Sequence, residues 1–314
     1  MKMKKIYTLL ALTITFSMNA QVSTNNVSTT GIYASAMGNG TTASGNESTA
    51  MGYDTTASGE ASTAMGYSTT ASAQGSTAMG KLTTASHTAS TAMGQSTTAS
   101  AAFTTAIGYN TTASGSYSTA MGRYTTASGF TSTAMGWSTT ASDYSSTVIG
   151  QYNSSGSSAT SASSFSTSAP AFVIGNGTAS NAKSDAFKVM FNGDATVSND
   201  LTVSGDVVIS SDARLKSNIV SLGSTLPKLL QIDGKSYEMK GKQKIGVLAQ
   251  EIKEVFPELV SEDDNEMLAV NYQGLVPVLI NALKEQQSEI EILKQQQAEI
   301  DELKEMVNQL TADK

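Results

Sequence analysis

A repeating pattern of apolar and small polar positions fills the first half of the chain. Met-Gly or Ile-Gly recurs nine times in strict steps of fourteen residues, at Met37, Met51, Met65, Met79, Met93, Ile107, Met121, Met135 and Ile149. The consensus unit reads S-T-A-M-G-x-x-T-T-A-S-x-x-x. Extended alternation puts Thr49 and Met51 on one face, and likewise Thr55 and Ala57. Because Thr, Ser and Gly at this density disfavour helix, the pattern predicts two short strands per unit, stacked as a parallel β-solenoid over residues 31–150.

The predicted interior of each coil is small. It would contain one Met or Ile and otherwise only small residues, which is a poor core for a single chain. Apolar burial between chains would remedy this, so the pattern favours an oligomer.

The repeat resembles the head repeat of trimeric autotransporter adhesins of the YadA-like type, whose motif reads roughly S-V-A-I-G-x-x-S-x-A-x-G. Residues 48–52 (STAMG) and 55–59 (TTASG) fit this motif, with Thr in place of Val and Met usually in place of Ile. The resemblance implies a homotrimer of left-handed β-rolls with a surface-binding role. The chains of that family end in a membrane anchor, which we do not expect here.

The residue after each Met-Gly should form a row along the solenoid. Four members are aromatic, and an exposed aromatic row could bind sugars or peptides: Tyr53, Tyr67, Tyr109 and Trp137. The alternative is ordinary surface or inter-chain packing. An ice-binding face is disfavoured because Thr55 and Thr56 are adjacent and point to opposite faces. A calcium-binding repeat would need Asp in each turn, and Asp is nearly absent.

Beyond the repeat the pattern of apolar and polar residues changes three times. Residues 151–170 are Ser-rich and predict a loose connector or a decayed coil. Residues 171–210 predict a β-stalk or neck, since a six-residue period (TVSNDL, TVSGDV, VISSDA) begins at Thr196. Residues 276–310 then show apolar spacings of three and four, so the segment 284–314 is predicted to form a coiled-coil tail. A single amphipathic helix packed on its own domain is the alternative for 276–293.

Composition and charge narrow the classes of function. The chain has 314 residues, no Cys, one His (His87) and a net charge of −7. These features exclude disulfides and Cys nucleophiles and disfavour His-based metal sites, Ser-His-Asp chemistry and nucleic-acid binding. Residues 21–182 carry six charges, whereas residues 211–314 carry thirty. We expect no cofactor and no metal.

The N-terminus reads as a targeting segment. Residues 1–20 combine a basic start (Lys2, Lys4, Lys5) with an apolar run of eleven residues and Ala20 at the expected cleavage point. This is typical of a secretory signal peptide, and a short buried helix is the alternative. The expected location is extracellular or at a bacterial cell surface, with no transmembrane segment in the mature chain.

Three motifs follow in order in the last hundred residues: SDARLKSNI (211–219), GVLAQE with VFPELV (246–260), and VNYQGLVPVLI (270–280). They resemble the C-terminal intramolecular chaperone of endosialidases and other phage tailspikes and fibres, a self-cleaving peptidase family. The resemblance covers about residues 210–283, and it implies a small α+β chaperone domain over 211–283.

That resemblance also assigns chemistry. Ser211 matches the family's nucleophile and Lys216 its general base, with the cut between Ser210 and Ser211. A Ser hydroxyl needs an activator, and a Lys can serve if burial or a neighbouring cation lowers its pKa. Arg214 is the candidate neighbour. From the local sequence alone, Ser210 or Ser211 is predicted simply to cap a helix that begins there.

The sequence therefore predicts a mainly β, trimeric solenoid with a β-stalk, followed by a small α+β chaperone domain and a coiled-coil helix. The expected function is that of a secreted or surface-bound adhesin-like fibre. Its C-terminal domain would drive trimerisation and then act once as a Ser/Lys endopeptidase on its own chain. The partners would be two further copies of the chain and a host, matrix or glycan ligand. The alternative is a structural spacer or tail-fibre-like protein with no ligand and no cleavage.

Overall fold

The computed structural model describes residues 26–263 and 266–312. The chain forms two compact units that divide between Asp206 and Val207. The predicted signal peptide lies outside the described residues. Within the described part, the search for a helix long and apolar enough to cross a membrane finds none.

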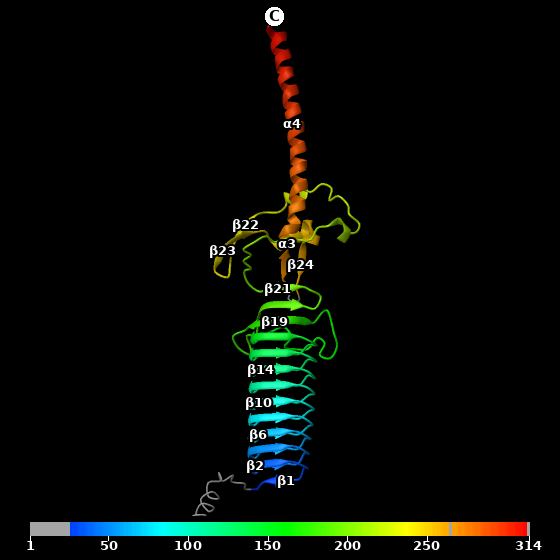
Figure 1. Cartoon of the computed structure of the whole chain (residues 1–314). Coiled ribbons are helices and arrows are strands. Elements are labelled where there is room, and N and C mark those ends of the chain that lie inside the picture. Colours follow the sequence, from blue (N-terminus) through cyan, green and yellow to red (C-terminus); the bar gives the residue numbers. More distant parts are fainter. Residues whose placement is uncertain (1–25, 264–265, 313–314) are drawn as a thin grey trace, which may run out of the picture. The chain divides into compact units, whose positions relative to one another are not determined.

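The first unit is a parallel β-solenoid in which every coil contributes one longer and one shorter strand (Figure 1). The longer strands are β2 (Ser35–Asn39), β4 (Thr49–Tyr53), β6 (Thr63–Tyr67), β8 (Thr77–Lys81), β10 (Thr91–Gln95), β12 (Thr105–Tyr109), β14 (Thr119–Arg123), β16 (Thr133–Trp137) and β18 (Thr147–Gln151). The shorter strands are β1 (Ser28–Thr29), β3 (Thr42–Ala43), β5 (Thr56–Ala57), β7 (Thr70–Ala71), β9 (Thr84–Ala85), β11 (Thr98–Ala99), β13 (Thr112–Ala113), β15 (Thr126–Ala127) and β17 (Thr140–Ala141).

Successive coils pair with a constant offset of fourteen residues. Thr91 pairs with Thr105, and Ala92 pairs with Ala106. The shorter strands keep the same register, as Thr98 and Thr112 show. The fold predicted for this part is confirmed, and the repeat length equals one turn of the solenoid.

The interior of the coils differs from the prediction. Ala50 and Ala57 are buried, as are their Ala equivalents in the following coils and Val148 in β18, whereas Met51 is 39% exposed. Thr49, Met51 and Tyr53 alternate with Ala50, so the methionines point away from the core. The prediction that Met or Ile fills the interior is therefore wrong. In the repeated coils the two strands enclose Ala and small hydroxyl residues, with Val148 at the Ala position of the last one, and the methionines lie outside.

The glycine after each methionine lies where the next coil leaves no room for a side chain. Gly94 has φ +118°, and a Cβ built on it would clash with the carbonyl oxygen of Gly108 in the next coil. Most residues avoid this backbone conformation. The repeated Gly therefore permits both the bend and the close stacking of the coils.

The Ser-rich segment after β18 is hydrogen-bonded to the last coils. Asp143 is buried, and its Oδ1 accepts hydrogen bonds from the amides of Thr160 (2.6 Å) and Ser161 (2.7 Å). The side-chain amide of Asn153 makes two hydrogen bonds to the backbone of Thr140. Its Oδ1 accepts the Thr140 N–H at 2.8 Å, and its Nδ2 donates to the Thr140 carbonyl at 2.9 Å. These contacts hold the segment against the end of the solenoid as an irregular extra coil.

The longer sheet then ends in an antiparallel meander. β19 (Pro170–Asn176) pairs in parallel with β18, with Val173 opposite Val148. β20 (Asp185–Met190) and β21 (Ala195–Val197) follow in antiparallel order. From Ser198 to Asp212 this single chain forms no helix or strand, so the β-stalk expected from the six-residue period remains a prediction about assembled chains.

The second unit is small and mixed in structure. It begins with a 3₁₀ turn, η1 (Ala213–Leu215), and helix α2 (Leu226–Leu229), followed by a hairpin of β22 (Lys235–Met239) and β23 (Lys242–Gly246). Next come α3 (Ala249–Val255), η2 (Pro257–Leu259), the antiparallel pair β24 (Val260–Glu262) and β25 (Leu268–Val270), η3 (Tyr272–Gly274) and the long helix α4 (Leu275–Ala312). The predicted α+β class is confirmed.

The core of the second unit is formed where α4 begins. Ile252 of α3 is fully buried, and Phe256 and Val278 are nearly so. Leu229 and Val247 are partly buried against them. The first turns of α4, as far as Ala282, therefore belong to this small domain, whereas Leu283, Ile290 and Leu293 are exposed. The packed-helix alternative for 276–293 thus holds only for the start of that range.

Candidate functional site

The residues expected to carry the cleavage chemistry lie together in one short turn. Asp212 caps η1, and its Oδ1 accepts the Arg214 backbone N–H at 2.8 Å. The expectation that Ser210 or Ser211 caps a helix here is wrong, because the segment begins one residue later and the Asp212 carboxylate accepts its free amide. This tight turn brings the residues on its two sides, Ser211 and Lys216, back toward each other.

The Nζ atom of Lys216 donates a hydrogen bond of 2.8 Å to the Oγ of Ser211. This distance is within the range that a nucleophile and its base need for direct proton transfer. Both side chains are exposed in the single chain. The arrangement is chemically suited to a Ser/Lys pair once Lys216 has lost its proton, because the same contact would then let Nζ accept the hydroxyl proton.

Arg214 is engaged by a carboxylate. Its Nη2 lies 2.7 Å from Oδ2 of Asp212, and its Nε also donates to that carboxylate. Hydrogen bonding to Arg214 lowers the pKa of Asp212, and hydrogen bonding to Asp212 raises the pKa of Arg214. The ion pair braces the turn, and it partly compensates the positive charge that would act on Lys216. A tuning role for Arg214 remains a prediction.

A carboxylate on α4 connects the long helix to the chain that follows this turn. Glu285 accepts hydrogen bonds from Thr225 N–H (2.6 Å), Ser224 Oγ (2.7 Å) and Leu226 N–H (3.3 Å). These donors lower the pKa of Glu285, the Thr225 amide most of all. The contact, which we term the Glu285 clasp, was not expected from the sequence, because it joins segments about sixty residues apart.

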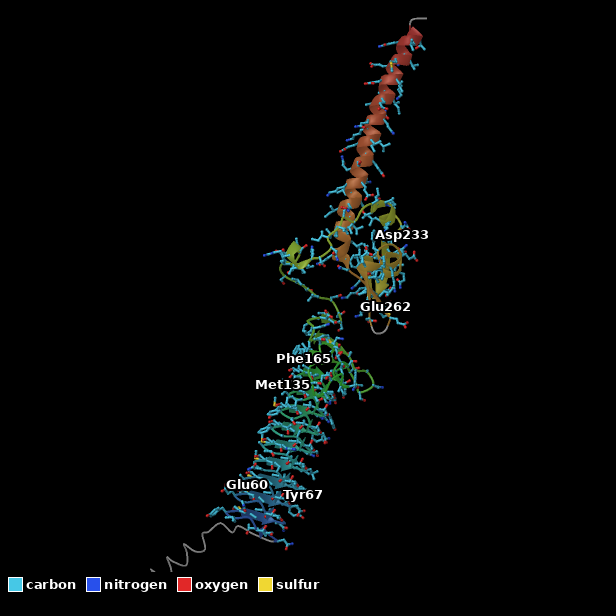
Figure 2. The ribbon with its side chains drawn as sticks, turned by 90° about the vertical axis from the view of Figure 1, so that its right-hand side faces the viewer. Glu60, Tyr67, Met135, Phe165, Asp233 and Glu262 are labelled. Carbon is cyan, nitrogen blue, oxygen red and sulfur yellow. The ribbon has the colours of Figure 1, made fainter. Side chains whose placement is uncertain are left out.

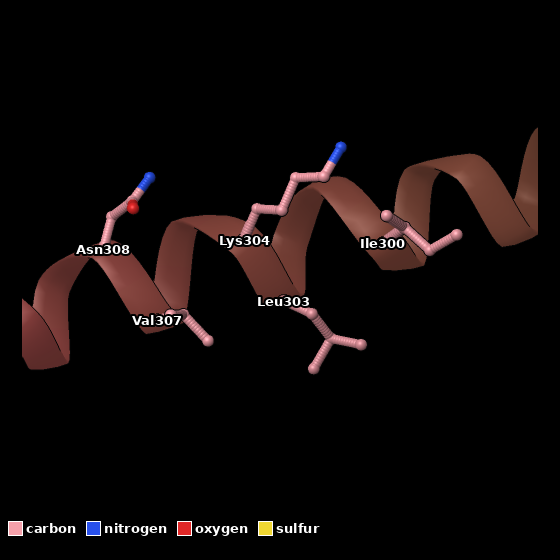
Figure 3. A pocket seen from close by; sticks show the side chains of 5 residues that line it. All are labelled: Ile300, Leu303, Lys304, Val307 and Asn308. Atoms are coloured by element: carbon pink, nitrogen blue, oxygen red, sulfur yellow. The ribbon is translucent and has the colours of Figure 1, made fainter.

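Beyond the clasp, α4 presents apolar side chains to solvent. Leu293 is 63% exposed and Leu303 is 56% exposed. Figure 3 shows Leu303 and Val307 on one side of the helix, with Lys304 and Asn308 on the other. A hollow along one lone helix suits the side chains of another helix better than a small ligand.

The expected row on the solenoid is present. The pairings Tyr53 with Tyr67 and Arg123 with Trp137 place the residues after Met-Gly side by side in successive coils, and Figure 2 shows side chains repeating from coil to coil. The rings of Tyr53 and Tyr67 stack face to face, 5.1 Å apart and 7° from parallel. Each ring therefore covers a face of the other, which favours packing over sugar binding for this pair.

Farther along the same row the rings surround a cation. The guanidinium of Arg123 lies 5.6 Å from the ring centre of Tyr109, 5.1 Å from that of Tyr124 and 5.7 Å from that of Trp137. A hydrogen bond from Arg123 lowers the pKa of the Tyr124 hydroxyl. The sequence pointed to Tyr109 and Trp137 but missed Tyr124, which is the next residue in the chain after Arg123.

A second aromatic row, at the opposite turn of the coil, was also missed. Phe103 and Tyr117 stack at 5.0 Å, Tyr117 meets Phe130 at 5.4 Å, and Phe130 stacks on Tyr144 at 5.5 Å. The signal was available as the fourteen-residue spacings from Phe103 to Tyr117 and from Phe130 to Tyr144. This row is a second set of packed rings between coils.

No candidate metal centre emerges from these residues. Within 26–263 and 266–312, no three His, Cys, Asp or Glu side chains gather closely enough to hold an ion.

Two family models match the chain. Residues 30–55, 57–83, 85–111, 99–125 and 127–153 match the YadA head domain repeat, and residues 211–261 match the chaperone of endosialidase. The second match begins at Ser211. No curated protein matches the chain. Both resemblances drawn from the sequence are thus confirmed, the first over the whole repeat and the second as far as residue 261, which leaves the motif at 270–280 outside the match.

Proposed function

We propose that this protein is an exported, trimeric, adhesin-like fibre whose C-terminal unit assembles the three chains and then cuts itself off. The observation that carries the proposal is the 2.8 Å contact between Lys216 Nζ and Ser211 Oγ. It lies at the first residue of the segment that matches the endosialidase chaperone, downstream of a solenoid that matches the YadA head repeat. The export step rests on the signal-like residues 1–20.

Trimerisation of the head is supported by the outward methionines. One Met or Ile per coil lines the outer face of the longer sheet, and members such as Met37 and Met51 are more than a third exposed in the single chain. A continuous apolar row of this length on the surface favours burial against other chains. Three copies would bury their rows against one another and supply the apolar burial that the Ala-lined coil interiors lack.

The chaperone role is supported by α4 and the Glu285 clasp. The exposed Leu and Ile residues of α4 suit a short coiled coil, which forms from local contacts and therefore quickly. Stacked parallel strands form more slowly and expose unpaired edges while they fold. A tail trimer formed early would raise the effective concentration of the three fibre ends, and the clasp would connect that tail to the segment after Lys216.

The cleavage chemistry balances with one water molecule. Neutral Lys216 accepts the proton of the Ser211 hydroxyl, and Oγ attacks the carbonyl carbon of Ser210. The carbon–nitrogen bond between Ser210 and Ser211 breaks, and the Ser211 nitrogen takes up a proton to leave as a free amine. Water then hydrolyses the ester, which frees the Ser210 carboxylate and restores the Ser211 hydroxyl. Each chain would perform this reaction once.

Removal of the chaperone would also fix the product kinetically. Once its nucleating tail is gone, the fibre has no low-barrier route by which to unfold and reassemble. Self-cleavage would therefore stabilise the assembled fibre kinetically, even if the peptidase acts on no other substrate.

The test compares the full chain with a variant lacking residues 284–314. Multi-angle light scattering of the protein purified after expression of the full chain should give three head chains per particle. The truncated chain should remain uncleaved and aggregate, because the heads would have to assemble without their nucleus. A stable, folded monomer from the full chain would contradict the trimer, and normal soluble trimers from the truncated chain would contradict the chaperone role.

A further inference from the structure

One position on the head combines exposed aromatic rings with a positive charge. Tyr109, Arg123 and Trp137 end three successive long strands, β12, β14 and β16, and Tyr124 projects beside them from the following turn, where its φ is +56°. We term these four residues the Arg123 cluster. Since neighbouring strands lie about 4.8 Å apart, the three strand ends extend over about 10 Å of the rod.

The guanidinium in this cluster is held by rings. Its centre lies within 6 Å of the Tyr109, Tyr124 and Trp137 ring centres, a distance at which cation–π attraction acts. Such contacts fix the orientation of the guanidinium and leave N–H donors for another acceptor. The cluster is therefore a preoriented donor group.

The charge of Arg123 has no carboxylate facing it in the surrounding coils. Asp143 is the only acidic residue between Gln95 and Tyr152 in the sequence. Its side chain is buried at the opposite turn of the coil, where it accepts the amides of Thr160 and Ser161. Arg123 is also the only basic residue in that stretch, so the cluster is an isolated positive site.

The rings of this cluster are arranged differently from the stacked pair at Tyr53 and Tyr67. Tyr109 and Tyr124 meet edge to face at 88°, and Trp137 is tilted by 54° against Tyr152. Trp137 is 43% exposed and Tyr124 is 42% exposed. The cluster differs from the stacked pair, whose residues are 45% and 48% exposed, in that its accessible rings lie beside a guanidinium.

We propose that the Arg123 cluster is a binding site for acidic polysaccharides. Arg123 would bind a carboxylate or sulfate group through paired N–H donors, while Trp137 and Tyr124 would pack against the apolar faces of the adjoining sugar rings. Arg123 is the last residue of β14, two residues after Met121 on the same outward face, so the cluster lies at the turn edge of the methionine row that the trimer would bury. A regular polymer suits this edge, because the trimer would present three equal clusters and so gain from multivalent contact. The inference rests on the proposed role of the head as an exposed, adhesin-like fibre.

The test measures binding of the purified trimer to four immobilised probes by surface plasmon resonance: polygalacturonate, dextran sulfate, neutral dextran and poly-glutamate. The variants are Arg123→Gln, Arg123→Lys and Trp137→Ala. The matched control is Lys81→Gln, which removes one cation from the same row, where Lys81 contacts only the Tyr67 ring at 5.8 Å. Circular dichroism and light scattering of every variant establish that each is folded and trimeric.

The wild type should bind polygalacturonate or dextran sulfate, more weakly as salt rises, and should not bind dextran. Arg123→Gln should weaken binding by about tenfold or more, since a charged hydrogen-bond pair is lost. Arg123→Lys should weaken it nearly as much, because paired recognition is lost. Trp137→Ala should reduce affinity by about three- to tenfold, and Lys81→Gln should change it by less than about twofold.

Three outcomes would overturn the site. Equal losses in Lys81→Gln and Arg123→Gln would mean that binding depends on general charge, and binding to poly-glutamate but not to the acidic polysaccharides would mean that the ligand is an acidic peptide. Loss of the trimer in Arg123→Gln would assign the cluster to packing between chains. Failure of the trimer or of self-cleavage in the wild type would instead contradict the proposed function, and those two properties are read by light scattering and mass without any ligand.

Discussion

Lys216 donates a 2.8 Å hydrogen bond to the hydroxyl of Ser211 across a turn that Asp212 caps. The two residues are five positions apart, and the sequence pairs them only through a family resemblance. The structure supplies a local reason for their meeting. The 3₁₀ turn Ala213–Leu215 reverses the chain, and the Asp212–Arg214 ion pair at 2.7 Å braces it.

The glycines after Met should be far less tolerant of substitution than Gly75, a turn glycine with open space around it. Gly94→Ala should destabilise the head by more than about 1–3 kcal/mol, because backbone strain at φ +118° adds to a clash with Gly108. Thermal unfolding followed by circular dichroism should show a clearly lowered midpoint. The matched control is Gly75→Ala, where the nearest atom is 4.0 Å away. The equivalent residues Ala61 and Ala89 already adopt a similar positive φ, so this control should cost about 1 kcal/mol or less. Equal losses in both variants would show that coil stacking does not select the glycines.

The outward methionines should stabilise the trimer and contribute little to the single coil. Replacing Met79 and Met93 together by Gln should lower the denaturant concentration at which chains dissociate, since each apolar side chain buried between chains contributes roughly 1.5–3 kcal/mol. Sedimentation velocity in increasing urea measures this directly. The paired control makes the same replacement at Thr84 and Thr98, which begin β9 and β11 of the shorter sheet. If the control dissociates as readily as the Met variant, the interface has been placed on the wrong face.

The Glu285 clasp should make the C-terminal unit sensitive to acid. Its donors lower the pKa of the folded Glu285 carboxyl, so the stabilisation is present at neutral pH and is lost as pH falls through that lowered pKa. Glu285→Gln should therefore melt at a lower temperature at pH 7, and the difference from the parent chain should disappear as pH falls through the lowered pKa of Glu285. The experiment follows helical circular dichroism of the uncleaved Ser211→Ala chain, with Glu289→Gln, one turn further along α4, as the control. A constant difference between Glu285→Gln and the parent at all pH values would argue against an ionised clasp.

The repeat shows what a sequence pattern can and cannot decide. Strict fourteen-residue spacing established the register, because identical units pair best when stacked in phase. Alternation separated Met51 from Ala50 but did not say which faces inward. Bulk suggested Met, yet the inward positions are occupied by Ala and small hydroxyl residues in most coils and by Val148 in the last one.

Contacts between segments far apart in the sequence could not be predicted from the pattern of residues. Asp143 holds the amides of Thr160 and Ser161, and Glu285 holds those of Thr225 and Leu226. In each contact one carboxylate accepts hydrogen bonds from backbone N–H groups. Because every residue except Pro has such a group, the residue types at the donor positions do not reveal the contact. The contact between Ser211 and Lys216 could be anticipated through the family motif that contains both residues, whereas that between Tyr124 and Arg123 could not, since it depends on the turn after Arg123.

Removal of the base should abolish the cut without preventing assembly. Lys216→Ala and Lys216→Arg should both remain full length, the second because a guanidinium cannot accept the hydroxyl proton. Arg214→Ala should slow the cut without abolishing it, since Asp212 still caps the turn through the backbone amide. Time courses on denaturing gels measure the rate, and dilution of folded trimer should leave it unchanged. Normal cleavage of Lys216→Arg would remove Lys216 from the role of base.

Intact mass spectrometry of the purified protein tests the central claim most directly. The wild type should give a C-terminal fragment that begins at Ser211 and ends at Lys314, 104 residues in length. Ser211→Ala should give a trimer in which residues 210 and 211 remain joined, because no hydroxyl is left to attack. Cleavage of Ser211→Ala at the same bond as in the wild type would show that an outside protease makes the cut, and would contradict the account.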